Sequence, residues 1–148
     1  MYKKILVPLD QRFATEAALK VAADLARANG SAIRLLHVAP RPAAVMVDGR
    51  MIAYADQESE RLRYEAEVYL REAARWVTGV PVEYAVRFGD PAAEIIEEAR
   101  ESGANLIAMA THGRTGMARL LLGSVAEAVL RRSEVPVLLV RHGLPAAA

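Results

Sequence analysis

The chain has 148 residues, of which 53% are hydrophobic and 25% are charged, the balance of a globular protein rather than a disordered or fibrous one. Its 19 basic and 18 acidic residues leave a formal net charge of +1, so no overall field draws it to nucleic acid or anionic lipid. It contains no cysteine, which excludes disulfides, cysteine-ligated metal sites and thiol catalysis.

The length is that of one domain, and we expect a single domain over residues 1–148. No apolar run approaches the ~18 residues that a membrane span requires. The N-terminus reaches Pro8 and Asp10 before a signal-length apolar segment develops. We therefore expect a cytoplasmic protein without a membrane or nucleic-acid partner.

The first third of the chain alternates strand-length apolar runs with helical periodicity. Residues 5–9 are continuously apolar, which is typical of a central strand buried on both faces. Residues 14–28 repeat apolar side chains every three or four positions before Asn29-Gly30, which predicts an amphipathic helix. A second strand is expected over residues 32–38. Residues 43–57 show no clean period, which predicts a long surface loop.

The helical period returns over residues 58–77, with Trp76 on the face that is expected to pack in the core. Residues 81–88 alternate loosely and predict a third strand. Asp90 followed by Pro91 then predicts the capped start of a short helix.

The last third completes the pattern. Residues 106–110 predict a fourth strand and residues 124–132 a helix, and a final strand is expected over residues 135–141. Strands that alternate with helices in this way indicate an α/β fold with a parallel sheet.

One edge of such a sheet favours ligand binding. In an open parallel sheet, ligands bind outside the carboxyl ends of the strands, where Asp10 and residues 111–116 would lie. Gly113 and Gly116 allow a ligand close to the backbone, and the amide groups of the helix that starts at Ser124 favour an anion. These features predict a phosphate site, although neither a Walker A sequence nor a GxGxxG motif is present.

Three stretches carry a more specific signal: KILVPLD at residues 4–10, LHV at residues 36–38, and THGRTG at residues 111–116 running through LLLGSV at 120–125 to PVLLV at 136–140. With these motifs the chain resembles the universal stress protein family over almost its whole length. The nucleotide-binding branch of that family carries Gly, two residues, Gly, nine residues, Gly and then Ser or Thr. This chain matches with Gly113, Gly123 and Ser124, and it has Ala110 at the first position.

The resemblance implies a fold and a ligand. The implied fold is a single open five-stranded parallel sheet in the order 3-2-1-4-5 with helices on both faces, Rossmann-like and paired as a homodimer through the last strand. The implied cofactors are ATP and Mg²⁺. The matching positions are Pro8, Asp10 and Val38 on the adenosine side, Ala110, Gly113, Gly123, Ser124 and Val125 on the phosphate and ribose side, and Asp10 as the metal ligand.

Three functions stay open at this point. The leading hypothesis is a small stress-response protein that binds an adenine nucleotide as a sensor or regulatory module for unknown protein partners. The alternative is a dimeric interaction protein of the same fold without nucleotide, favoured by Ala110 and by the bulky Gln11-Arg12 after Asp10. The third is a slow ATPase, for which the spacing fixes no acid and base pair.

Individual residues also have structural interpretations. Ser124 and Glu127 have the spacing of a capping box, in which the Ser124 hydroxyl satisfies a helix amide with or without a nucleotide. His37 lies in a strand and is expected in the core, and His112 is as compatible with a structural hydrogen bond as with a phosphate contact.

Overall fold

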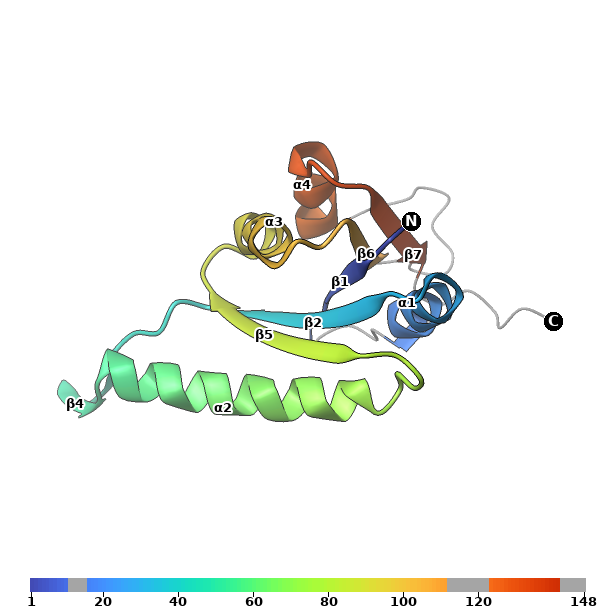
Figure 1. Ribbon diagram of the computed structural model, residues 1–148. Helices are drawn as coiled ribbons and strands as arrows, with labels where there is room; N and C mark the ends of the chain where they lie inside the picture. Colours follow the sequence, from blue (N-terminus) through green and yellow to red (C-terminus); the bar gives the residue numbers. More distant parts are fainter. Residues whose placement is uncertain (11–15, 112–122, 142–148) are drawn as a thin grey trace, which may run out of the picture.

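A computed structural model describes residues 1–10, 16–111 and 123–141, with Glu16 described by its backbone alone. Within this range the strands are β1 (Lys4–Pro8), β2 (Ala32–Ala39), β3 (Val45–Val47), β4 (Arg50–Ala53), β5 (Val82–Phe88), β6 (Leu106–Thr111) and β7 (Val137–Arg141) (Figure 1). The helices are α1 (Glu16–Asn29), α2 (Ala55–Ala74), α3 (Pro91–Ser102) and α4 (Ser124–Arg132).

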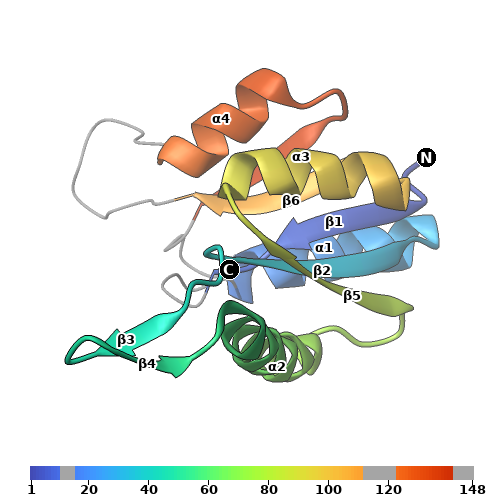
Figure 2. The same ribbon diagram turned by 90° about the vertical axis from the view of Figure 1, so that its left-hand side faces the viewer.

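The central element is a five-stranded sheet in the order β5-β2-β1-β6-β7, with every neighbouring pair parallel. Counted along the chain, the strands of this sheet stand in the order 3-2-1-4-5, so the predicted topology is confirmed. Helices α1 and α2 cover one face and α3 and α4 the other, as Figure 2 shows. The fold is therefore a Rossmann-like three-layer arrangement.

Strand β1 is the centre of the sheet, and its apolar run explains why. Ile5 and Val7 join the core beneath α1 and α2, whereas Leu6 joins the core beneath α3 and α4, and all three are fully buried. Successive side chains of a strand point to opposite faces, so a continuously apolar strand fits only between two covered faces. Burying each of these side chains contributes about 1.5–3 kcal/mol.

Helix α3 shows how local sequence sets an element's ends. The Asp90 carboxylate accepts a hydrogen bond from the Ala93 amide at 3.0 Å, and Pro91 occupies the first helical position. Gly103 ends the helix with a φ of 74°, a left-handed conformation in which glycine is unstrained. Both predicted signals thus act as expected.

The Asn105 side chain joins the N-terminus to the start of β6. Its Oδ1 accepts hydrogen bonds from the amides of Lys3 at 3.0 Å and Lys4 at 3.3 Å, and its Nδ2 donates to the Met1 carbonyl at 3.2 Å. The first strand is therefore held in place by a residue about a hundred positions later in the chain.

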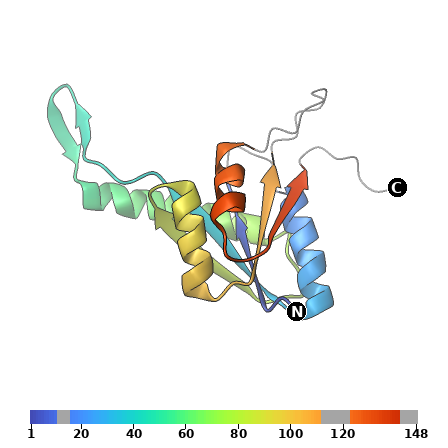
Figure 3. The ribbon, with the colours of Figure 1, turned by 90° about the horizontal axis from the view of Figure 1, so that it is seen from above.

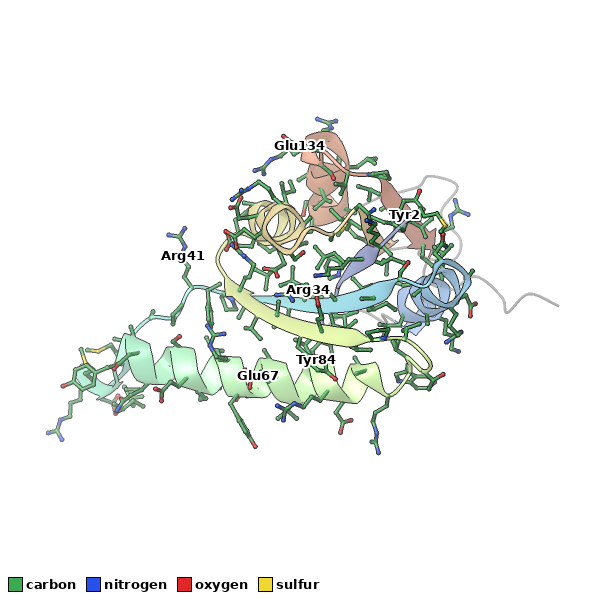
Figure 4. All side chains as sticks on the ribbon, viewed as in Figure 1. Tyr2, Arg34, Arg41, Glu67, Tyr84 and Glu134 are labelled. Atoms are coloured by element: carbon green, nitrogen blue, oxygen red, sulfur yellow. The ribbon has the colours of Figure 1, made fainter. Side chains whose placement is uncertain are left out.

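Charged side chains occupy the sheet face between β2, β5 and α3, and Figure 4 labels Arg34 there. The Glu98 carboxylate is 5% exposed and accepts from Arg34 Nε at 2.6 Å and from Arg87 Nη1 at 2.7 Å. We call the connected group the charge network; its members are Lys4, Arg34, Glu83, Arg87, Glu94, Glu98 and Glu101.

The charge network keeps its carboxylates ionised. Burial alone raises the pKa of Glu98, but the hydrogen bonds from Arg87 and Arg34 outweigh burial and hold the pKa below its ordinary value. The pKa of Glu83 is lowered in the same way, by hydrogen bonds from Lys4 and Arg34 that outweigh its burial. The ionised carboxylates of the charge network therefore stabilise the folded state.

The structure corrects the predicted loop over residues 43–57. This segment contains the antiparallel hairpin of β3 and β4, and α2 already begins at Ala55. The hairpin turn is Asp48-Gly49, with φ values of 50° and 73°, the positive pair of a two-residue hairpin turn. The short strands expose both of their faces, so they lack the apolar and polar alternation by which strands are predicted.

The predicted core position of Trp76 is also wrong. Helix α2 ends at Ala74, so Trp76 leaves the helical phase and is 51% exposed. Its ring instead faces the Lys20 ammonium at 5.5 Å from the centroid, a cation–π contact.

Within the described part of the chain, none of the helices has both the length and the apolar character needed to span a membrane.

Candidate functional site

The sheet changes strand order between β1 and β6. Chain connections run from β1 outward to β2 on one side, whereas β6 and β7 lie on the other side of β1. In open parallel sheets, ligands bind outside the carboxyl ends of the two strands at which the connections diverge in this way. Asp10 follows β1, and Ala110 and Thr111 end β6, so all three lie at this point.

The end of β1 is held rigidly. The Leu9 amide donates to the Leu36 carbonyl at 2.8 Å, and the Leu9 carbonyl lies 3.0 Å from His37 Nδ1. A carbonyl only accepts, so this nitrogen carries the hydrogen. The His37 ring also meets Tyr69 of α2 edge to face, with centroids 5.7 Å apart. His37 is therefore a half-buried clamp on the residue before Asp10 rather than the core residue predicted.

The start of α4 leaves amide groups without a side-chain cap. The N-cap is Gly123, with φ 76° and ψ 150°, and among the described residues no side chain accepts from its amides. Ser124 is the first helical residue and is exposed, so the predicted capping box is wrong. The Glu127 carboxylate pairs with Arg131 at 2.7 Å one turn later instead. A glycine is required at the cap because other residues are strained at this φ.

Thr111 supplies a second unsatisfied group. Its side chain is 4% exposed, and its Oγ1 makes no hydrogen bond with any described residue. Ile107 and Met109 of β6 belong to the core under α3 and α4, so alternation along the strand places Thr111 on that same face. An unpaired buried hydroxyl costs about 1–3 kcal/mol, a cost that a bound ligand offsets.

The predicted site residues gather around one edge of the sheet. Pro8 ends β1, Val38 lies near the end of β2, and Ala110 pairs with Val140 near the ends of β6 and β7. Gly123, Ser124 and Val125 form the start of α4, which connects β6 to β7 at this edge (Figure 2). Gly113 and the rest of its loop lie outside the described residues, as do Gln11 and Arg12.

Cations have few protein ligands at this edge. Nowhere in residues 1–10, 16–111 and 123–141 do three or more His, Asp or Glu side chains form a group able to hold a metal ion. Asp10 is half-buried and is the carboxylate that follows the central strand. A magnesium ion held by one carboxylate, phosphate oxygens and water fits such a donor set, because Mg²⁺ usually keeps several waters and shares ligands with a phosphate.

Thr111 is a candidate that the sequence motifs do not single out. It stands directly before His112-Gly113, and its position at the end of an apolar strand predicts burial of a polar group. The signal for His37 is its place one residue before Val38, in a strand that neighbours β1. Two adjacent parallel strands bring His37 and Leu9 together.

Comparison with known proteins identifies the family and supports the fold. The model of the universal stress protein family matches residues 1–141. The universal stress protein MJ0531 of Methanocaldococcus jannaschii is 36% identical over 148 aligned residues, which cover 95% of this chain and 83% of that protein.

Solved structures share the fold. The structure of MJ0577 from Methanocaldococcus jannaschii superposes with a TM-score of 0.76 at 28% identity, covering 98% of this chain and 99% of the other. A universal stress protein solved in complex with cAMP superposes with a TM-score of 0.64 at 21% identity, covering 94% of this chain and 97% of the other. The family match, the relatives and the shared fold together place this chain in the universal stress protein family.

Proposed function

We propose that the protein binds an adenine nucleotide, ATP with Mg²⁺, at the carboxyl edge of the sheet and acts as a cytoplasmic stress-response module. In this proposal the chain is one domain over residues 1–148. The base and ribose contact Pro8, Asp10 and Val38, and the phosphates contact Ala110, Gly113, Gly123, Ser124 and Val125. Occupancy of the site changes the surface offered to protein partners, and the chain is at most a slow ATPase.

The observation that carries this proposal is that two kinds of donor, uncapped helix amides and a buried hydroxyl, lie on the same face of the sheet. The first turn of α4 offers backbone amides without a side-chain cap among the described residues, and the buried Thr111 hydroxyl lies on the same face of the sheet. Helix N-termini attract anions through the amides and the helix dipole. Phosphate oxygens accept hydrogen bonds from amides and hydroxyls alike, whereas an apolar ligand accepts none.

The adenosine side is supported by packing at the end of β1. The His37 clamp and the Leu9 amide fix the backbone before Asp10, so the carboxylate is presented from a rigid support. A side chain whose backbone is already held in place loses little conformational entropy when a ligand binds. Asp10 would hold the Mg²⁺, and the ion would supply positive charge that neutralises the phosphates. The solved relative with cAMP shows that one member of this fold accepts an adenine nucleotide.

Dimerisation is the second part of the proposal. Strand β7 lies at the edge of the sheet, and its residues Val137 to Val140 are half-buried rather than covered. An apolar edge strand with unpaired backbone groups favours pairing with a second copy. We propose that two copies associate through β7.

Calorimetric titration of Mg·ATP tests nucleotide binding. We expect saturable binding by the wild type and its loss in Gly123→Asp, which adds a carboxylate at the proposed phosphate position. Gly123→Ala is the matched control, because it strains the same backbone position, with φ 76° and ψ 150°, without adding a carboxylate. Retained binding by Gly123→Ala shows that backbone strain alone does not explain the loss.

The same titration decides between the candidate functions. Absence of binding in the wild type favours the nucleotide-free interaction protein, whose supporting observation is the methyl group of Ala110 beside β7. Ala110→Gly then distinguishes the cause: restored binding identifies the methyl as the obstacle. Phosphate release by the wild type at no more than the rate of a Gly113→Asp variant excludes the ATPase.

A further inference from the structure

Arg141 is the last residue of β7, at the carboxyl end of the strand that lies beside β6. The two strands run parallel, and Thr111 and Arg141 are partners at the final position of their register. Figure 3 shows the arrowheads of β6 and β7 side by side, with the start of α4 near the same end. Arg141 therefore lies at the edge of the sheet where the proposed phosphate contacts gather.

The Arg141 side chain shares a face of the sheet with the Thr111 hydroxyl. Val137 and Leu139 of β7 pack against the core under α3 and α4, whereas Leu138 packs against the core under α1 and α2. Alternation along the strand continues this pattern and places Arg141 on the face under α3 and α4. The 4% exposed Thr111 side chain, whose Oγ1 has no hydrogen bond with a described residue, lies on that face as well.

The positive charge of Arg141 is not matched locally. Its side chain is exposed and forms no ion pair with any residue that the structure describes. Glu127 is the acidic residue in the first turn of α4, and its carboxylate already pairs with Arg131 at 2.7 Å. An exposed arginine is ordinary by itself. This one stands beside a buried unpaired hydroxyl and near helix amides that no described side chain caps, and all three kinds of group bind anions.

The order of the strands indicates which part of a nucleotide Arg141 would meet. The proposed adenosine contacts include Pro8 of β1 and Val38 of β2, and the proposed phosphate contacts begin with Ala110 of β6. Strand β7 is the next strand in the same direction, about 4.8 Å beyond β6. A phosphate chain that continues across the strand ends in this direction brings its outer phosphates, rather than its first, to Arg141.

We propose that Arg141 binds the outer phosphates of the nucleotide and makes the affinity depend on the number of phosphates. This inference rests on the proposed function, since it requires a nucleotide at this edge of the sheet. A guanidinium group donates two parallel hydrogen bonds to phosphate oxygens and carries a permanent positive charge. The preferred ligand is then a nucleoside triphosphate, in contrast to cAMP, the nucleotide with a single phosphate that one solved relative holds.

The ratio of the affinities for Mg·ATP and AMP tests the proposal. Arg141→Gln removes the charge, and we expect calorimetric titration to show about tenfold weaker binding of ATP and less than about twofold weaker binding of AMP. AMP is titrated by displacement, so that weak binding is measured too. Arg141→Lys keeps the charge without the planar fork and should lie between the two. Arg132→Gln is the matched control, because it removes an exposed charge at the last residue of α4 and should change neither affinity.

The affinity ratio separates a phosphate contact from an effect on the fold or on pairing through β7. Either of those effects lowers the affinities for ATP and AMP alike, so an equal loss in Arg141→Gln overturns the proposal, as does unchanged binding of both nucleotides. Failure of the wild type to bind either nucleotide overturns the proposed function and this inference with it. Binding by the wild type together with an unchanged ratio in Arg141→Gln overturns this inference alone.

Discussion

On the sheet face under α3 and α4, the polar groups near β5 are paired, whereas those near β6 have no partner among the described residues. Beside β5, the charge network pairs a nearly buried carboxylate with two guanidinium groups. Beside β6, the equally buried Thr111 hydroxyl and the first amides of α4 have no such partners among the described residues. Buried polar groups that are paired stabilise the fold, whereas buried groups left unpaired lower stability and indicate a ligand.

The largest expected effect breaks the paired side. Glu98→Ala leaves Arg34 and Arg87 without their shared carboxylate, so we expect the free energy of unfolding to fall by about 3 kcal/mol. Urea denaturation measures the loss. Glu97→Ala is the control, since Glu97 pairs with Arg100 on the exposed surface of α3 and its removal is expected to cost far less stability. Equal losses would contradict the contrast.

Acid should weaken the same side. Because the folded-state pKa of Glu98 lies below the ordinary value of 4.5, the network's contribution is complete above that pH and is lost as the pH falls through the lowered pKa. We expect the unfolding free energy of the wild type to fall more than that of Glu98→Ala between about pH 6 and about pH 3. Parallel pH profiles would show that other carboxylates dominate.

Removal of the unpaired hydroxyl near β6 should change the free energy of unfolding in the opposite direction. Thr111→Val removes a hydroxyl that has no partner among the described residues, so we expect the free protein to become about 1 kcal/mol more stable while its affinity for Mg·ATP falls. Ser31 offers the comparison: its fully buried hydroxyl donates to the Tyr2 carbonyl, and Ser31→Ala should destabilise. A destabilised Thr111→Val protein would show that its hydroxyl already serves the fold.

The smallest expected effect is a loss of Mg·ATP affinity when the hydrogen bond from His37 to the end of β1 is removed. His37→Phe keeps a ring edge for Tyr69 but loses the hydrogen bond to Leu9, so we expect Mg·ATP affinity to fall about fivefold. His37→Asn, which retains a donor near the same position, should recover part of the loss. Equal affinities for wild type and His37→Phe would show that the clamp does not position Asp10.

The sheet could be predicted from the sequence because its strands are apolar and separated by helical periods. The edge where Asp10 and Gly123 gather follows from topology alone, since the carboxyl ends of parallel strands meet at one side. These parts of the fold rest on patterns repeated over many residues, and single local conflicts do not disturb them.

Features set by one backbone angle or by distant partners could not be predicted. Ser124 has the spacing of a cap, but the chain enters α4 through the positive φ of Gly123, which moves the cap by one residue. Arg34 and Glu83 are charged, so the sequence alone suggests that they face solvent. They form an ion pair only because β2 and β5 lie side by side under α3. The hairpin could not be predicted because both faces of its strands are exposed, so the sequence lacks the alternation of apolar and polar residues.

The Asn105 contacts with the N-terminus also bear on how the chain folds during synthesis. Strand β1 is made first, yet its partner β6 and the side chain that holds its start come about a hundred residues later. Contacts of such sequence separation slow folding, because a long loop must close before they form. The proposed ligand edge between β1 and β6 is therefore completed only after β6 has been made, and until then the edge of β1 that pairs with β6 is exposed to aggregation.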